Sequence, residues 1–387
     1  MIPQADKRIK RRPIPELAAD QDEYCRIVQD MVANGGSLIS DPNWLVGDDR
    51  SDVPSAYDRE AALHFALSEE AFLQRFSKMK PLMNAWVGGA RVPTPTAISK
   101  YRHFLERNDP LMLWEVNVEK PIDGIRLLEP DFGTLMDLNL LYGFSRGGRL
   151  TRILEVGGGY GRLTEAAFNI FGGSVRYVLV DAVPASLYYS KKYLTHACPD
   201  ARIRSYYDAE GAFDFEEYDI SIVPSWHFEK LNRISYDLCV NIESMQEMNQ
   251  HHVDYYLNLF DSVAADEAII YLSNSHDYYF KGSFRYPTHW QKLFCSNTPR
   301  SWTRDHPTEM FRKTKTDCSF QNAIQDANYR YGLWMQNDPK EFIIRNGPES
   351  VIAPAIKALA HRMRSKVRAR TRLQHLSSRI RGLKNIS

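Results

Sequence analysis

The sequence predicts an α/β fold built on an open, doubly wound and mostly parallel sheet. Apolar segments of strand length alternate with segments of helix length, and the first apolar strand ends abruptly in a run of glycines. The expected strands are short and apolar, at 153–156, 176–180, 219–223, 237–241 and 268–273. Helices are expected between several of them, at 161–171, 184–196 and 245–264. Strands separated by helices pair in parallel through right-handed crossovers.

Three regions are expected along the chain. Residues 1–125 form a mostly helical N-terminal region, a cap or substrate region for a binding site, and residues 126–345 form the α/β domain. Its last strands, and a loop over the site, come from 281–345. Residues 346–387 form a basic, amphipathic helical tail. Outside the sheet, helices are predicted at 15–33, 57–80, 97–107 and 133–144.

The composition indicates a soluble globular protein of the cytoplasm. Of the 387 residues, 43% are hydrophobic and 25% are charged, which is ordinary for this class. The five cysteines are scattered, and no CxxC pair occurs, so neither a disulfide framework nor a zinc site is expected. The basic N-terminus lacks the apolar segment of a signal peptide, and no apolar run is long enough to span a membrane.

The glycine run predicts a nucleotide-type cofactor. Gly157, Gly159 and Gly161 give a G-x-G-x-G spacing, and Glu155 precedes the first glycine by two residues. Gly158 lies within the same run, and only glycine lets the backbone turn sharply and approach a ligand closely. The expected second strand ends at Asp181, where a carboxylate can accept hydrogen bonds from both hydroxyls of a ribose.

This pattern, E-x-G-x-G-x-G, resembles the first motif of class I S-adenosylmethionine-dependent methyltransferases. The resemblance implies a Rossmann-like fold and S-adenosyl-L-methionine, rather than NAD, as the cofactor. It implies that Glu155 helps to hold the methionine amino group and that the glycines let the backbone pass close to the cofactor. Together with VLVD, VPSW and NIESMQEM, the pattern resembles a bacterial family of sugar O-methyltransferases over roughly 150–275, with weaker echoes at 297–300 and 305–307.

The turn after the fourth expected strand bears on the acceptor. Enzymes that methylate amide or exocyclic amino nitrogens often carry an N-P-P-Y-like turn there, whereas this chain has Asn241-Ile242-Glu243-Ser244. A carboxylate suits an alcohol acceptor, because the hydroxyl must lose its proton as it attacks the methyl group. We therefore expect O-methylation of a sugar or glycan precursor. The alternatives are O-methylation of another small molecule and a non-catalytic cofactor-binding protein of the same fold.

The general base has three candidates. Glu243 is the first, because Glu247 forms an S-x-x-E capping box with Ser244 and so has a structural role. His276 and His306 are the second and third, because a histidine titrates near neutral pH, although such loop histidines more often bind backbone.

Two further residues are expected beside the cofactor, and no metal site is predicted. Asn241 ends the fourth strand, and Trp226 either flanks the adenine or fills the gap between sheet and helix. His251 and His252 are adjacent on a helix and point about 100° apart, so they cannot easily hold one ion. The remaining acids considered for magnesium are Asp277 and Asp305.

The tail has an electrostatic character opposite to that of the body. Residues 355–387 contain ten Lys or Arg and no Asp or Glu, whereas the whole chain has a net charge of +1. The segment is either simply solvated, or an amphipathic element on an anionic membrane surface, or a partner for another helix. Nucleic acid is a less favoured partner, since the body is acidic and carries no recognised nucleic-acid motif. Nothing in the sequence bears on an oligomeric state.

Overall fold

The structure is a computed structural model, and it describes most of the chain from residue 150 to residue 336. The described residues are 20–35, 95–106, 109–120, 127, 129–145, 150–208, 213–275, 284–298 and 306–336. The helix predicted at 57–80, the candidate base His276 and the basic tail lie outside these residues.

The centre of the fold is an eight-stranded sheet with the order β3-β4-β2-β1-β5-β6-β8-β7. Its first six members pair in parallel, and β8 runs antiparallel to both β6 and β7. In chain order the strands are β1 (Arg152–Val156), β2 (Arg176–Asp181), β3 (Ile203–Ser205), β4 (Ile220–Pro224), β5 (Tyr236–Ile242), β6 (Ala264–Ser273), β7 (Trp290–Asn297) and β8 (Pro307–Lys313). This is the Rossmann-like arrangement of class I methyltransferases, so the predicted fold class is confirmed.

The five predicted strands are present, and 281–345 supplies the last two strands, as expected. The strand β3 was not predicted from the sequence. This edge strand is three residues long and pairs only with β4, which leaves too short a pattern to recognise.

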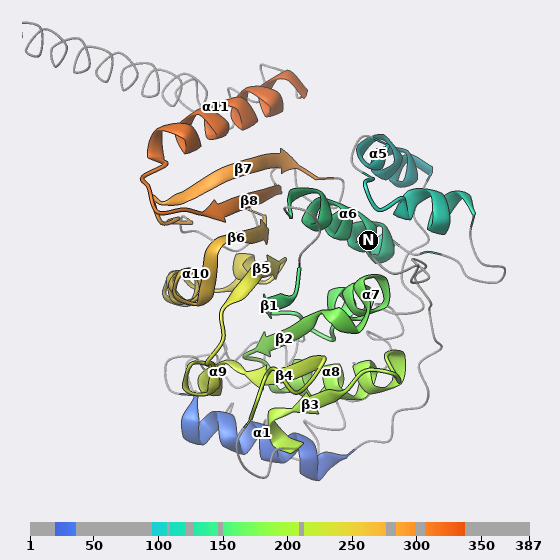
Figure 1. The fold of residues 1–387 in the computed structure, drawn as a ribbon, viewed down its shortest axis with the longest axis vertical. Helices are drawn as coiled ribbons and strands as arrows, with labels where there is room; N and C mark the ends of the chain where they lie inside the picture. Colours follow the sequence, from blue (N-terminus) through green and yellow to red (C-terminus); the bar gives the residue numbers. More distant parts are fainter. Residues whose placement is uncertain are drawn as a thin grey trace, which may run out of the picture.

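Helices cover both faces of the sheet (Figure 1). One face carries α6 (Glu129–Phe144), α7 (Arg162–Phe171) and α8 (Pro184–Ala197), and the other carries α9 (Ser225–Leu231) and α10 (Gln250–Val263). Alternate strand residues enter the two cores: Ile153 belongs to the cluster under α6 to α8, and Leu154 to the cluster under α10. Since both faces are buried, the central strands β1, β2, β4 and β5 consist mostly of apolar residues.

The helix α6 is buried almost all round, because N-terminal elements cover its outer side. The helix α5 (Pro95–Leu105) and the segment 109–120, which includes a π-helical turn η3 (Glu115–Glu119), pack against it. Asn139 of α6 is 1% exposed, and it binds both Asp109, through Nδ2 to Oδ1 at 2.6 Å, and the backbone N–H of Leu111 at 3.1 Å. The division into three regions remains a prediction.

Two more helices lie at opposite ends of the sheet (Figure 1). The helix α1 (Gln21–Asn34) packs on α8 and α9 beside the β3 edge, and α11 (Ser319–Gln336) packs on β7. Among the described residues, no helix has both the length and the apolar character needed to cross a bilayer.

The predicted helix at 245–264 is two elements rather than one. Residues Met245–Glu247 form a single 3₁₀ turn, η7, and α10 starts only at Gln250, where the Asn249 side chain accepts the N–H of His252 at 3.0 Å. The predicted capping box is wrong, because the Ser244 side chain makes no cap hydrogen bond to that turn. Its hydroxyl accepts from Asn241 Nδ2 at 2.9 Å instead.

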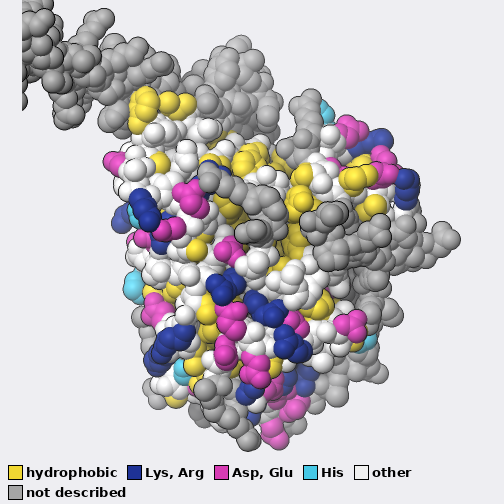
Figure 2. Space-filling view, viewed as in Figure 1, with side chains coloured by type: hydrophobic (Ala, Val, Ile, Leu, Met, Phe, Trp, Pro, Cys, Tyr) yellow, Lys and Arg dark blue, Asp and Glu magenta, His cyan; other side chains and the backbone are white. Residues whose placement is uncertain are grey.

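The surface of the described residues mixes charges of both signs. On the face shown in Figure 2, lysine and arginine side chains lie among aspartate and glutamate side chains. Surface ion pairs include Arg152–Glu216 at 2.8 Å and Lys315–Asp266 at 2.6 Å. On this face, the described lysine and arginine side chains are interspersed with acidic ones and form no extended basic surface of the kind that binds nucleic acid.

Candidate functional site

The loops that follow the parallel strands meet along one edge of the sheet. The register pairs Val156 with Val180, Asp181 with Pro224, and Ile242 with Ser273, so β1, β2, β4, β5 and β6 end close to one another. The antiparallel β8 begins at the same edge, since Ser273 pairs with Thr308. Ligands of open α/β sheets bind at this carboxyl edge.

The glycine turn after β1 is closed on most sides and open at Gly159. A β-carbon on Gly157 would lie 2.0 Å from Ser244 Oγ, and one on Gly161 would lie 2.8 Å from a methyl carbon of Leu194. A β-carbon on Gly158 would lie 2.9 Å from the Glu155 carboxyl group. Around Gly159, with φ of +58°, the added carbon would meet nothing within 4 Å. Of these four glycines, only Gly159 therefore has open space beside its backbone.

Glu155 is buried beneath this turn, with only 4% of its surface exposed. The Tyr177 hydroxyl donates to its Oε2 at 2.7 Å, and the Thr164 hydroxyl donates to the same oxygen at 3.2 Å. Within the described ranges, Oε1 accepts no hydrogen bond. Burial raises the pKa of Glu155 to about 7, against the opposing effects of the Tyr177 hydrogen bond and the Arg162 charge. A cationic ligand group at this carboxyl would favour its ionised form.

Asp181 joins the end of β2 to the glycine turn. It is 5% exposed, and its carboxyl accepts the N–H of Val183 at 2.8 Å and that of Gly159 at 3.3 Å. Burial raises the pKa of Asp181 to about 6, although the backbone hydrogen bonds oppose the shift. Two buried carboxyls with raised pKa values thus adjoin the glycine turn, Glu155 at Gly158 and Asp181 at Gly159, and carboxyls of this kind cluster at functional sites.

Asn241 has a structural role that the sequence did not reveal. It is fully buried; its Nδ2 donates to Val156 O at 2.8 Å and to Ser244 Oγ, and its Oδ1 accepts from Met245 N at 3.1 Å. These bonds hold the turn after β5 against the end of β1. The cofactor-binding role predicted for Asn241 remains a prediction.

Trp226 lies in the first turn of α9, two residues beyond the partner of Asp181. It is 5% exposed, and its indole N–H donates to Asp30 of α1 at 2.8 Å. Its predicted place beside the adenine stays a prediction. The contact with α1 left no signal in the sequence, because it joins residues 196 positions apart.

Two of the three candidate bases come together around the end of β6. Glu243 is half-buried in a left-handed conformation with φ of +56°, which is unusual for a non-glycine residue, and its N–H donates to Ser273 O at 2.8 Å. His306 is 2% exposed, and its Nε2 lies 3.4 Å from Ser273 Oγ. Glu243 is the more accessible of the two. His276 lies outside the described residues.

A buried amide near this point was not predicted from the sequence. Asn274, directly after β6, is 3% exposed, and its Nδ2 has no hydrogen-bond partner among the residues that the structure describes. Its Oδ1 accepts from Gln246 N at 3.3 Å, and Gln246 Oε1 accepts from Ser275 N at 2.6 Å, so the turns after β5 and β6 are linked. An unpaired buried donor costs about 1–3 kcal/mol. The only signal in the sequence was a run of polar residues after an apolar strand.

No group of three or more His, Cys, Asp or Glu side chains that could hold a metal ion occurs within the described residues. His251 and His252 both lie on α10, with ring centroids 5.7 Å apart. Asp277 and Asp305 lie outside the described ranges.

Comparisons with known proteins gave weak similarities to solved structures. No family model matches the chain, and no curated protein matches it. An O-methyltransferase from Bacillus cereus in complex with SAH has 12% identity and a TM-score of 0.34, covering 60% of this chain and 97% of that one. The O-methyltransferase TomG from Streptomyces achromogenes, in complex with SAM, has 12% identity and a TM-score of 0.33, covering 62% and 98%. The StiE O-MT structure has 9% identity and a TM-score of 0.35, covering 51% and 81%. Similarities this weak do not establish an activity for this chain. Its fold is defined by the strand order of the sheet.

Proposed function

We propose that this chain is an S-adenosylmethionine-dependent O-methyltransferase that acts on a hydroxyl group of a sugar or glycan precursor. One observation carries the proposal. Among the four glycines of the turn, Gly157, Gly158 and Gly161 are closed and Gly159 is open, and two buried carboxyls adjoin the turn at the carboxyl edge of the sheet: Glu155 beside Gly158, and Asp181 bonded to the Gly159 N–H.

The residues at this edge fit the two ends of the methyl donor. Glu155 suits the cationic methionine end, because its Oε2 is held by Tyr177 and Thr164 while Oε1 accepts no hydrogen bond from the described residues. Asp181 suits the ribose, because it lies at the end of β2 beside the Gly159 backbone. When bound, the donor supplies an electrophilic methyl group on a sulfonium.

The chain's own contribution to the chemistry is to orient the acceptor hydroxyl and to remove its proton. We assign proton removal to Glu243, because its position in the turn after β5 is fixed by the bond from its N–H to Ser273 O. His306, whose Nε2 lies 3.4 Å from Ser273 Oγ, is the second choice. A base of this kind accelerates a reaction by about 10²–10⁴-fold.

The sugar acceptor is the finer part of the proposal. It is supported by the resemblance of the VPSW and NIESMQEM segments to sugar O-methyltransferases, and by a carboxylate in the turn after β5. Mass spectrometry of glycans from cells with and without the protein tests it. The proposal requires a glycan species that gains the mass of one methyl substitution only when the protein is present, and unchanged glycan spectra would reject it.

The donor site is tested by a matched pair of glycine substitutions. Gly159 and Gly172 both have positive φ, +58° and +72°, and a β-carbon added to either would meet nothing within 4 Å. Both substitutions therefore strain the backbone, by about 1–2 kcal/mol for a residue in the left-handed region. Gly172→Ala is the more demanding control, because the ψ of −175° at Gly172 lies in a region that essentially only glycine adopts. Only Gly159 faces the proposed donor site, whereas Gly172 ends α7.

Calorimetry with S-adenosylhomocysteine then distinguishes the two variants. We expect the wild-type protein and Gly172→Ala to bind it alike, and Gly159→Ala to bind it at least about tenfold more weakly, since the added carbon would occupy the ligand's approach to the backbone. Equal affinities of the two variants would place the ligand elsewhere. Binding of NAD by the wild-type protein, without binding of S-adenosylhomocysteine, would overturn the cofactor assignment.

A further inference from the structure

The helix α1 is bonded to the first turn of α9, which follows β4 at the carboxyl edge. Asp30 of α1 accepts the indole N–H of Trp226 at 2.8 Å, and His227 Nε2 lies 3.0 Å from both carboxylate oxygens of Asp30. Burial raises the pKa of Asp30, but the hydrogen bonds from His227 and Trp226 outweigh it and hold the pKa below its ordinary value. A charged carboxylate therefore joins α1 to α9.

The same carboxylate also reaches the loop after β3. The Tyr207 hydroxyl donates to Asp30 Oδ2 at 2.8 Å, and the neighbouring Tyr206 ring is stacked on His227, with centroids 4.3 Å apart. Tyr206 and Tyr207 belong to the 3₁₀ turn η6 (Tyr206–Asp208). Asp30 thus binds the segments that follow two neighbouring strands, β3 and β4.

These segments border the proposed nucleoside end of the donor site. Asp181, the proposed ribose ligand, pairs in register with Pro224, the last residue of β4, and Trp226 follows two residues later. The orientation of the first turn of α9 therefore affects the surroundings of the nucleoside.

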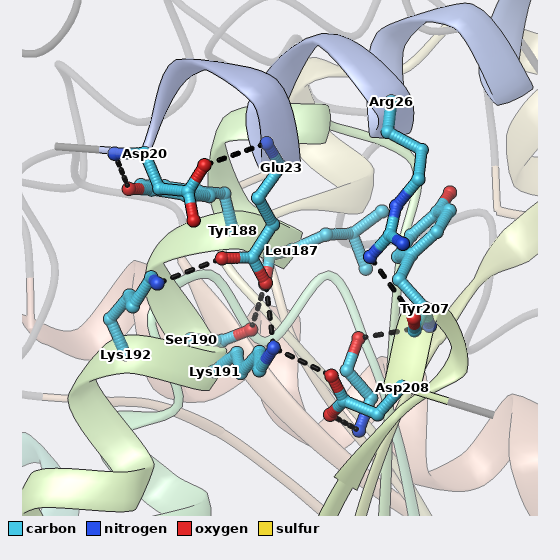
Figure 3. A network of polar contacts seen from close by, with 11 residues as sticks. Asp20, Glu23, Arg26, Leu187, Tyr188, Ser190, Lys191, Lys192, Tyr207 and Asp208 are labelled. Carbon is cyan, nitrogen blue, oxygen red and sulfur yellow. Dashed lines mark hydrogen bonds and ion pairs between the residues drawn. The ribbon is translucent and has the colours of Figure 1, made fainter.

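The attachment of α1 does not depend on Asp30 alone. Glu23, two turns earlier, accepts from Lys191 at 2.7 Å and pairs with Lys192 at 2.8 Å, and both lysines belong to α8 (Figure 3). The apolar side of α1 is buried at Tyr24, Ile27, Val28 and Met31. Glu23 and Asp30 are thus two polar anchors of one helix, and only Asp30 contacts Trp226 and His227.

We propose that Asp30 is a positioning residue of the donor site, which fixes the first turn of α9 and thereby the wall that encloses the nucleoside. The inference rests on the proposed function, because it takes the carboxyl edge near Asp181 as the nucleoside end. It gives the helix α1, which lies outside the sheet, a defined part in binding the donor.

The test compares Asp30→Asn with Glu23→Gln. Both substitutions remove one charge from the same face of α1, so urea unfolding of both variants measures the structural cost alone. We expect Asp30→Asn to weaken S-adenosylhomocysteine binding by about tenfold, the size of one charge-assisted hydrogen bond. Adenosine, measured by competition, should lose the same factor. Glu23→Gln should change either affinity by less than about twofold.

Trp226→Phe breaks the Asp30 contact from the other side and provides a second route if Asp30→Asn does not fold. In the double variant, the loss of affinity should be smaller than the product of the two single losses, because both remove the same contact. If the two single losses of affinity multiply in the double variant, the inference is overturned. It is also overturned if Asp30→Asn and Glu23→Gln lose affinity equally, or if Asp30→Asn binds as tightly as the wild type. If the wild-type protein binds no S-adenosylhomocysteine, the proposed function fails first, and the two failures are thereby distinguished.

Discussion

Glu155 is buried at a cost to stability, and the substitution Glu155→Gln should reveal that cost. Burial raises its pKa from 4.5 to about 7, a displacement that corresponds to about 3 kcal/mol. Because the folded-state pKa is the higher one, the folded protein binds more protons than the unfolded chain between these two pH values. Ionisation of Glu155 therefore lowers the free energy of unfolding as the pH rises from 4.5 to 7.

Glutamine removes the buried charge and keeps an oxygen that can accept from Tyr177 and Thr164. Any packing cost of the new amide is independent of pH and cancels when two pH values are compared. The difference in unfolding free energy, variant minus wild type, should therefore be about 2–3 kcal/mol more favourable at pH 8 than at pH 5. The same variant should bind S-adenosylhomocysteine more weakly at pH 8, because the anionic partner of the ammonium group is lost.

Urea unfolding, followed by circular dichroism at both pH values, measures the first effect, and calorimetry measures the second. Glu106→Gln is the control for the change in chemistry, since the Glu106 side chain is 56% exposed and pairs only on the surface. It should shift the unfolding free energy by less than about 0.5 kcal/mol at either pH. A Glu155→Gln effect that is the same at pH 5 and pH 8 would refute the assignment of Glu155 as a buried acid with a raised pKa.

Four further outcomes are expected. Asp181→Ala should weaken S-adenosylhomocysteine binding by about tenfold or more, since it removes the proposed ribose acceptor; unchanged calorimetric affinity would exclude that role. In the wild-type protein the affinity for S-adenosylhomocysteine should fall as the pH drops from 8 to 5. The reason is that Glu155 and Asp181, with pKa values of about 7 and about 6, become protonated over this range and no longer serve as anions. An affinity that does not change with pH would contradict this. Glu243→Gln should lower kcat by about 10²-fold or more with the donor affinity unchanged, and normal turnover would assign the base to another residue. We propose that the basic tail binds the inner membrane surface, so deletion of residues 350–387 should abolish co-sedimentation with anionic vesicles. Undiminished sedimentation of the shortened chain would reject this role.

The sequence by itself determined where the main strands lie along the chain and where the glycine turn falls. Apolar strand segments and glycine-dependent turns are local properties, since each depends on residues that are adjacent in the chain. For the same reason the sequence alone places Glu155 and Asp181 at the ends of their strands. The helix limits were less well determined: α10 starts at Gln250, where the Asn249 side chain caps it, whereas Ser244 binds Asn241 and caps no helix.

Only the tertiary structure decided which residues meet at the carboxyl edge. The Ser244 side chain occupies the space that a β-carbon on Gly157 would need. This contact, in addition to the sharp turn, explains why position 157 requires glycine. Asp30 reaches Trp226 across 196 positions of the chain, and Tyr177 reaches Glu155 from the neighbouring strand. Such contacts depend on how elements pack, and packing is set by the combined burial of many side chains, which no local pattern specifies.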